Sequence, residues 1–236
     1  MFKNYKIISI TLFALILSSC SNKVPSKKIT TTNWSTANQQ VVNQYSKRAD
    51  TQLLPHFKQA GVSYPPKQIA LLAFKYEQIA ELWAKDQHSG WRYIKQYPLT
   101  PALGGLGPKL IEHDHKIPEG VYRIAHFNPF SKYHLSMMLD YPNEYDKQFA
   151  LRDGRINLGN EIFIHGKNSS AGCLSIGDRY MSQLYVLVNR IGKHNTRVII
   201  APNDLRKSDP KTLLAEQPAW VPELYSKLSQ QLAAFS

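Results

Sequence analysis

The sequence predicts one globular domain of the α+β class, with strands in the middle of the chain and helices towards both ends. An apolar content of 43% with 11% aromatic residues is typical of a folded protein rather than a disordered one. Several short runs between residues 91 and 201 are continuously apolar or alternate bulky and polar side chains, which is the pattern of strands. Residues 36–60 and 220–235 have helical composition instead.

The first forty residues are expected to precede the folded domain. Lys3 and Lys6 come before an apolar run, residues 7–17, that is too short to span a bilayer comfortably but suits a signal peptide. Residues 1–19 are therefore interpreted as a signal peptide, and the polar residues 20–40 as a flexible tether. An N-terminal helical segment is expected over residues 41–64. Gly61 is a plausible stop for its helix, and Pro55 would end or kink a helix that ran through it.

The middle of the chain contains most of the strand-like runs. Residues 69–86 fit one helix, but they also fit two strands around Tyr76-Glu77-Gln78, and their periodicity leaves both interpretations open. Further along, Asp178 could cap a helix that Gly192 ends, and residues 206–236 form a helical extension. Other strands are expected at residues 91–97, 121–125, 134–141, 162–164 and 197–201.

The cysteines indicate an exported protein. Leu17-Ser18-Ser19-Cys20 resembles a bacterial lipobox, which implies lipidation of Cys20 and cleavage before it. We therefore expect a cell-envelope protein that faces the periplasm and is anchored in a membrane by lipid, and Ser21 favours the outer membrane. Cys173 is then the only other thiol and has no partner for an internal disulfide. A lone thiol in an oxidising compartment is either buried and inert or functional.

The charge of the chain favours an anionic partner. Lys and Arg number 29 against 17 Asp and Glu, which gives a net charge of +12. The basic residues are scattered, however, and no nucleic-acid motif is present, so a nucleic-acid partner is not expected.

The segment from residue 162 to 178 contains the residues best suited to catalysis. A strand-like run ends at His165, and a short loop of Gly, Asn, Ser and Ala residues leads to Cys173. A cysteine nucleophile needs a base to take its proton and donors to hold the oxyanion. His165 could be the base, a main-chain carbonyl near Gly166 could orient its ring, and the amides of Gly172 and Cys173 could face the oxyanion.

A family resemblance makes these roles more specific. Ile164-His165-Gly166 with Ser170-Ala171-Gly172-Cys173-Leu174-Ser175 resembles the signature of YkuD-like L,D-transpeptidase catalytic domains. Gly107-Pro108-Lys109, Pro118-Glu119-Gly120-Val121-Tyr122 and Asp140-Tyr141-Pro142-Asn143 agree with the YafK-like branch, and the likeness covers about residues 65–203.

The resemblance implies a mainly β, sandwich-like catalytic domain over residues 65–205, with strands rather than a helix at 69–86. Three helices would flank the domain: one N-terminal, one after the catalytic cysteine and one C-terminal. The nucleophile would be Cys173 and the base His165, and the substrate-binding residues would be His134, Ser170 and Ser175. No cofactor or metal is expected.

The implied reaction is acyl transfer on peptidoglycan stem peptides, at the L-centre carbonyl of the third residue, through a thioester on Cys173. The acyl group would pass to an amine-bearing peptide or protein. The loop before Cys173 is shorter than in ordinary transpeptidases, and Ala171 and Ser175 replace residues that are usually larger and polar. Hydrolysis of the same bond, as a carboxypeptidase or amidase, therefore stays open.

Two other classes of function are also weighed. One is a non-catalytic lipoprotein that binds peptidoglycan. The other is a metallopeptidase, because the two imidazoles of His113-Asp114-His115 form a usable half-site, with His126 or His134 as a third ligand. The segment lies in loop-like sequence without a His-Glu-x-x-His pattern, so we expect a solvated polar turn instead.

Overall fold

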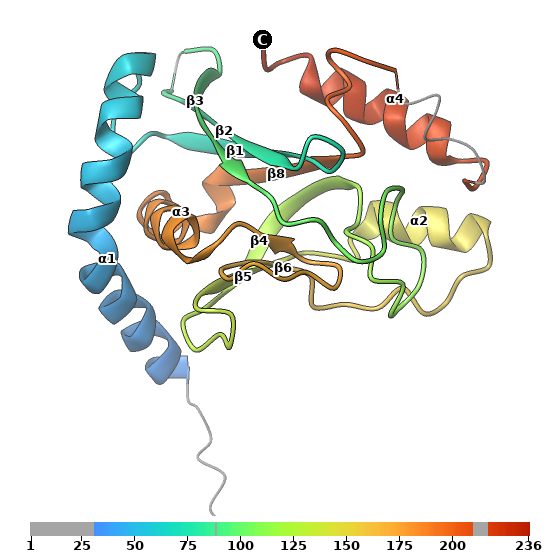
Figure 1. The fold of residues 1–236 in the computed structure, drawn as a ribbon, viewed down its shortest axis with the longest axis horizontal. Helices are drawn as coiled ribbons and strands as arrows, with labels where there is room; N and C mark the ends of the chain where they lie inside the picture. The colour runs from blue at the N-terminus through green and yellow to red at the C-terminus, as the bar shows by residue number, and fades with distance from the viewer. Residues whose placement is uncertain (1–30, 88, 210–216) are drawn as a thin grey trace, which may run out of the picture.

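The structure is a computed structural model that describes residues 31–87, 89–209 and 217–236 (Figure 1). The expected signal peptide and lipidation site, residues 1–19 and Cys20, lie outside the described residues. Across the described ranges, no helix combines the length and hydropathy that a membrane crossing requires.

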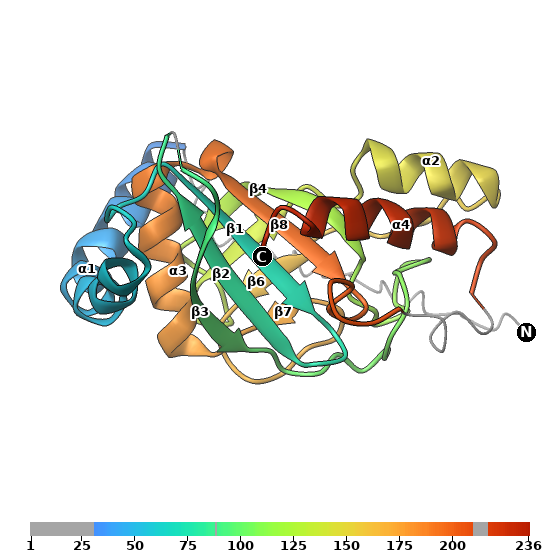
Figure 2. The ribbon, with the colours of Figure 1, turned by 90° about the horizontal axis from the view of Figure 1, so that it is seen from above.

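A single curled sheet of eight strands, in the order β3-β2-β1-β8-β4-β5-β6-β7, forms the centre of the fold (Figures 1 and 2). Neighbouring strands are antiparallel except for the parallel pairs β1–β8 and β6–β7. The predicted mainly β, α+β class is confirmed. The strands are β1 (Gln68–Phe74), β2 (Ile79–Lys85), β3 (Arg92–Pro98), β4 (Gly120–Asn128), β5 (Ser136–Leu139), β6 (Phe163–His165), β7 (Leu174–Ser175) and β8 (Thr196–Ala201).

Residues 69–86, which the sequence pattern left undecided, form the antiparallel hairpin of β1 and β2. Phe74 pairs with Ile79 next to the turn, where Gln78 takes a positive φ of 56°. β1 lies between β2 and β8, and all of its residues except Gln68 are buried. Its apolar run is continuous because both faces of the strand are covered, and such a run does not distinguish a strand from a buried helix.

Helices cover both faces of the sheet. They are α1 (Thr31–Ala60), α2 (Glu144–Arg152), α3 (Asp178–Ile191) and α4 (Val221–Leu232), with a 3-10 turn, η1 (Lys193–Asn195), before β8. α1 and α3 pack on one face and α4 on the other (Figures 1 and 2). Successive strand residues point to opposite faces of the sheet. Leu71 packs in the core between the sheet and helices α1 and α3, and Leu72 packs in the core between the sheet and α4.

The N-terminal helix corrects one expectation. It begins at Thr31, so residues 31–40 are helical rather than part of a tether. Pro55, which was expected to end or kink a helix, does not end it. Leu53 and Phe57, on either side of the proline, are fully buried, and their packing offsets the backbone hydrogen bond that Pro55 cannot make. The helix ends at Ala60, and the next residue, Gly61, has a φ of +67°.

The other helices also differ in detail from the sequence prediction. α2 was not expected; Asn143 and Asp146 form a capping box at its start. Asp178 is the first residue of α3 rather than its cap, which is Gly177. The Asp178 carboxylate instead accepts a hydrogen bond of 2.6 Å from the main-chain amide of Lys167, in the loop before Cys173.

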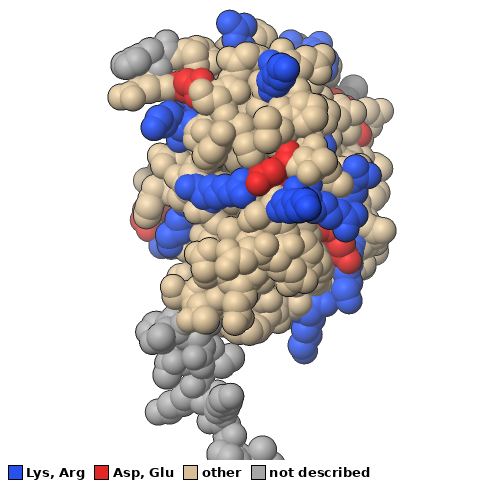
Figure 3. All heavy atoms as spheres, turned by 90° about the vertical axis from the view of Figure 1, so that its left-hand side faces the viewer, with Lys and Arg blue, Asp and Glu red and all other residues tan. Residues whose placement is uncertain are grey.

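The surface over α1 is predominantly basic. Figure 3 shows Lys and Arg side chains clearly exceeding Asp and Glu on this face, in keeping with the net charge of +12. Such a surface raises the encounter rate with an anionic partner.

Candidate active site

The histidine and the cysteine belong to two short strands that pair in parallel. β6 ends on His165, β7 begins one residue after Cys173, and the register pairs Ile164 with Leu174 and His165 with Ser175. The register therefore sets Cys173 beside Phe163, two residues before His165 on the neighbouring strand.

His165 is held as a neutral imidazole with one nitrogen available. The residue is only 3% exposed, and its Nδ1 lies 2.6 Å from the Gly166 carbonyl oxygen, which can only accept a hydrogen bond. Nδ1 must therefore carry the proton. Nε2 then has a lone pair with which it can accept a proton. Burial lowers the pKa of His165, although the hydrogen bond to Gly166 partly opposes that shift. The ring of Tyr133 packs against the imidazole, with 4.7 Å between centroids.

The turn after His165 requires glycine. A Cβ atom on Gly166 would lie 2.5 Å from Asp178 Oδ1 and 2.8 Å from the Tyr133 carbonyl oxygen. Since Asp178 also holds the Lys167 amide, a side chain at 166 would push apart the contacts that orient the imidazole.

The Cys173 thiol is partly exposed, and its surroundings raise its pKa. Its Sγ lies 4.0 Å from the main-chain oxygen of Glu161, a non-glycine residue with a positive φ of 55°. Burial raises the pKa of Cys173, the Phe163 amide and the Lys109 ammonium lower it, and the Glu161 carboxylate raises it further. Within the described part of the chain, the thiol and the imidazole make no hydrogen bond to each other. Such contacts often form only when substrate binds.

The two amides that we expected to face the oxyanion already donate hydrogen bonds to Ser170. Its Oγ accepts hydrogen bonds from the amides of Gly172, at 3.3 Å, and Cys173, at 3.1 Å, and donates to the Cys173 carbonyl at 2.6 Å. The buried Ser170 hydroxyl therefore fixes the loop rather than facing substrate as predicted. An oxyanion that binds these two amides would have to replace that hydroxyl oxygen.

Two further predicted substrate-binding residues also have partners inside the protein. Ser175 is fully buried and donates a 2.6 Å hydrogen bond to the Lys167 carbonyl. This bond ties β7 to the start of the loop that precedes Cys173. His134 Nε2 lies 2.8 Å from Ser182 Oγ on α3, and its ring packs edge-on against Tyr45 of α1. Its side chain therefore faces the helices rather than Cys173.

Residues 99–119 form a second loop that covers the segment before Cys173. The Thr100 amide donates to the Ser175 carbonyl at 2.9 Å, and the Leu103 amide donates to the Ser170 carbonyl at 3.3 Å. Gly104 allows the loop to close on itself, because a Cβ there would lie 2.4 Å from the Asp114 carbonyl oxygen. We call residues 99–119 the covering loop.

The motif Glu112-His113-Asp114-His115 is a turn within the covering loop. Asp114 accepts hydrogen bonds from Lys109 Nζ and from the amides of Leu110, Ile111 and Lys116. The two histidines both take positive φ angles. Among the described residues, no group of three or more His, Cys, Asp or Glu side chains is arranged to hold a metal ion.

A buried ion pair anchors the covering loop to β1. Lys75 Nζ lies 2.9 Å from Glu119 Oε1 and donates to the carbonyls of Gly107 at 2.6 Å and Ile117 at 3.0 Å. Both ionic side chains are almost completely buried. Lys75 therefore fixes the covering loop at Gly107 and Ile117. The covering loop in turn lies against the segment that contains Cys173.

Sequence reasoning assigned no contact with the thiol or the imidazole to three residues of this site. Tyr133 packs on the imidazole, Glu161 lies beside the thiol, and Lys109 is the cation that acts on it. Glu161 and Tyr133 each directly precede a segment that the sequence did single out, but nothing in their own spacing indicated a contact with His165 or Cys173.

The arrangement as a whole suits nucleophilic attack on a carbonyl. It combines a thiol, a buried imidazole with an oriented free nitrogen, and main-chain amides beside the thiol. These groups support acyl transfer through a covalent thioester.

Comparison with known proteins agrees with this chemistry. A family model described as "YkuD: L,D-transpeptidase catalytic domain" matches residues 73–200. The chain is 26% identical over 162 residues to "Putative L,D-transpeptidase YafK" of Escherichia coli K12, and the match covers 66% of this chain and 62% of that protein's length.

Solved structures resemble the fold more loosely. The helical cell shape determining protein Pgp2 of Campylobacter jejuni is 21% identical with a TM-score of 0.47, over 58% of this chain and 48% of Pgp2. Bd1075 of Bdellovibrio bacteriovorus is 20% identical with a TM-score of 0.43, over 73% of this chain and 57% of Bd1075.

Proposed function

Because this chain belongs to the YkuD family of L,D-transpeptidase catalytic domains, we propose that it is a cysteine acyltransferase acting on peptidoglycan stem peptides. The observation that carries this proposal is that a hydrogen bond holds the His165 imidazole in one tautomer. The Gly166 carbonyl fixes the proton on Nδ1 of His165, which leaves Nε2 to act as a base, and β6, which ends on His165, pairs with β7, which Cys173 directly precedes.

In the first half-reaction, Cys173 Sγ attacks the L-centre carbonyl of the third stem residue while His165 Nε2 takes the thiol proton. The bond from that carbonyl carbon to the nitrogen of the next residue then breaks. His165 returns its proton to the departing amine, and a thioester on Cys173 remains. The lowered pKa of His165 and the raised pKa of Cys173 both favour the uncharged pair over a thiolate and an imidazolium, which supports a proton transfer coupled to the attack.

In the second half-reaction, an amine attacks the thioester carbonyl, His165 accepts the amine's proton, and the proton returns to the Cys173 sulfur as the new amide forms. Water in place of the amine gives a free carboxylate. We propose hydrolysis as the second outcome because residues 167–171 form a short loop held by its own hydrogen bonds, which leaves little chain to shape a site for an acceptor.

The purified protein should be incubated with disaccharide tetrapeptide and the products identified by mass. Crosslinked dimers indicate transfer, and tripeptide with free D-alanine indicates hydrolysis. Cys173→Ala should abolish both, whereas Cys20→Ala, which removes the other cysteine of the chain, should leave product formation unchanged.

The same assay tests the other classes of function. Full activity in Cys173→Ala would eliminate the thiol mechanism, and inhibition by a chelator but not by a thiol alkylator would indicate a metallopeptidase. Wall binding without any product would indicate a non-catalytic lipoprotein.

For its location, we propose a periplasm-facing protein of the cell envelope, anchored through lipid on Cys20. The sequence Leu17-Ser18-Ser19-Cys20 supports this proposal, with Ser21 favouring the outer membrane. Metabolic labelling with a palmitate analogue should tag the wild type and not Cys20→Ala.

A further inference from the structure

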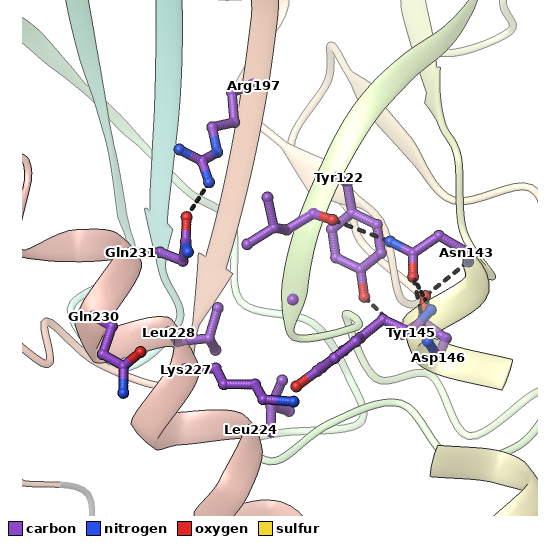
Figure 4. Close-up of a pocket in the computed structure, with 12 residues that line it drawn as sticks. Tyr122, Asn143, Tyr145, Asp146, Arg197, Leu224, Lys227, Leu228, Gln230 and Gln231 are labelled. Carbon is purple, nitrogen blue, oxygen red and sulfur yellow. Dashed lines mark hydrogen bonds between the residues drawn. The ribbon is translucent and has the colours of Figure 1, made fainter. Parts of the chain in front are cut away.

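A groove on the α4 side of the sheet shares no residue with the candidate active site. It lies between β4, β8, the start of α2 and the second half of α4, and its volume is about 310 Å³ (Figure 4). That volume is at the lower end of the roughly 300–1,000 Å³ typical of small-ligand sites. Its aliphatic lining residues, which we call the apolar floor, are Val121, Leu224 and Leu228.

Two arginines lie directly opposite each other beside this groove. Arg123 on β4 and Arg197 on β8 are register partners in the antiparallel pair, so their side chains project from the same face of the sheet. Like charges directly opposite each other destabilise a sheet. Neither arginine forms an ion pair with an acidic side chain of the described chain; Arg197 donates to the neutral Gln231 amide and Arg123 to the His194 carbonyl.

Arg197 is the cation that lines the groove itself. Burial lowers its pKa and the nearby Arg123 lowers it further. Figure 4 shows its guanidinium beside Gln231 at one end of the groove. A half-buried cation that faces a second cation and an uncharged amide lacks a counter-ion, and a bound anion would supply one.

Lys227 provides a second positive charge at the other end. Its ammonium lies 4.4 Å from the centre of the Tyr145 ring and 2.9 Å from Glu223 Oε1. Glu223 also pairs with Arg152, so one carboxylate serves two cations and the cluster stays positive.

The groove's own acid, Asp146, forms no ion pair with Arg197 or Lys227 among the described residues. Asp146 accepts hydrogen bonds from the Tyr122 hydroxyl and from the Asn143 amide, both at 2.9 Å, as part of the capping box of α2. Figure 4 shows it on the wall opposite Arg197.

We propose that this groove is a second binding site for an acidic peptide, with carboxylates at Arg197 and Lys227 and an aliphatic stretch on the apolar floor between them. The free nitrogen of the Gln231 amide would donate to a peptide carbonyl. Under the proposed function, the source is a stem peptide of the same wall, held apart from the one being cleaved.

The test is a titration of the Cys173→Ala protein, which cannot turn the peptide over, with free stem tetrapeptide, followed by backbone-amide NMR. We expect shifts at Arg197, Gln231 and Val121. Arg197→Gln should weaken binding at these signals about tenfold or more, the loss of roughly one charge-assisted contact. Arg92→Gln, at an exposed arginine on β3 away from the groove, should leave the affinity unchanged.

The same peptide with its carboxylates converted to amides should not shift the groove signals. Unchanged affinity in Arg197→Gln, or shifts confined to the segment around His165, would overturn the proposal. Tighter binding of decanoate than of the peptide would overturn the peptide assignment. Product formation by the wild-type protein is measured separately, so its absence counts against the proposed function and not against the groove.

Discussion

Substitution of Lys75 by Met should destabilise the protein strongly. The change removes the cation that faces the Glu119 carboxylate, which is 3% exposed, and leaves that acid buried with its second oxygen already unpaired. Breaking one half of a buried ion pair costs about 3–5 kcal/mol. In a protein of this size, each kcal/mol lowers the melting temperature by about 2–4 °C, so a fall of roughly 6–20 °C is expected.

The double variant separates the charge effect from the loss of packing. With Lys75→Met and Glu119→Gln together, no buried charge is left, and the remaining deficit is the lost donation to the Gly107 and Ile117 carbonyls. Each such hydrogen bond contributes about 0.5–1.5 kcal/mol. The double variant should therefore be more stable than Lys75→Met alone, and the acylation rate of Cys173 should fall in both because the covering loop loses its anchor.

Thermal and urea unfolding of the wild type, both single variants and the double variant give the coupling energy between the two residues. Lys67→Met, at an exposed lysine, is the control and should change stability by less than about 0.5 kcal/mol. A Lys75→Met protein as stable as the wild type, or a double variant as unstable as the sum of the two singles, would refute this reasoning.

Three further changes have defined outcomes. Glu161→Gln should lower the pKa of Cys173, because the Glu161 carboxylate raises it; the pH profile of iodoacetamide alkylation should then move to lower pH, and a shift to higher pH would contradict the assignment. Gly166→Ala should abolish product formation while Gly90→Ala, whose Cβ would meet nothing within 4 Å, should not; equal activities would show that the close contact does not orient the imidazole. Burial raises the pKa of Asp146 from 3.8 to about 6, so its contribution to stability is complete below about pH 4 and is lost as the pH rises through 6. Asp146→Asn should therefore remove a decrease on the order of 3 kcal/mol between those pH values in urea unfolding, and an unchanged pH dependence would contradict the raised pKa.

The sequence predicted the parts of the fold that local pattern determines. Strand β8 is a short apolar run between turn residues. The end of α3 is marked by Gly192, a residue type that commonly follows a helix. Residues 69–86 could not be decided from the pattern, because β1 is covered on both faces and loses its alternation. The passage of α1 through Pro55 agrees with the helical composition of residues 36–60, and the burial of Leu53 and Phe57 outweighs the helix-ending tendency of the proline.

The candidate site was predictable where chemistry depends on neighbours in the sequence. His165 and the adjacent Gly166 carbonyl are one example. The roles of Ser170 and Ser175 are harder to predict, because a serine hydroxyl can bond either substrate or its own loop, and in this structure both hydroxyls bond the loop. Tyr133 was not identified because its contact with the imidazole joins segments 32 residues apart in the chain.

The central claim is that Cys173 forms a thioester with its substrate, and intact-mass spectrometry of the protein mixed with a carbapenem tests it most directly. A carbapenem acylates a competent thiol and mimics the first half-reaction. We predict one stable adduct, located at Cys173 by peptide mapping, in the wild type and in Cys20→Ala, and no adduct in Cys173→Ala. An adduct of the same mass in Cys173→Ala would contradict the claim.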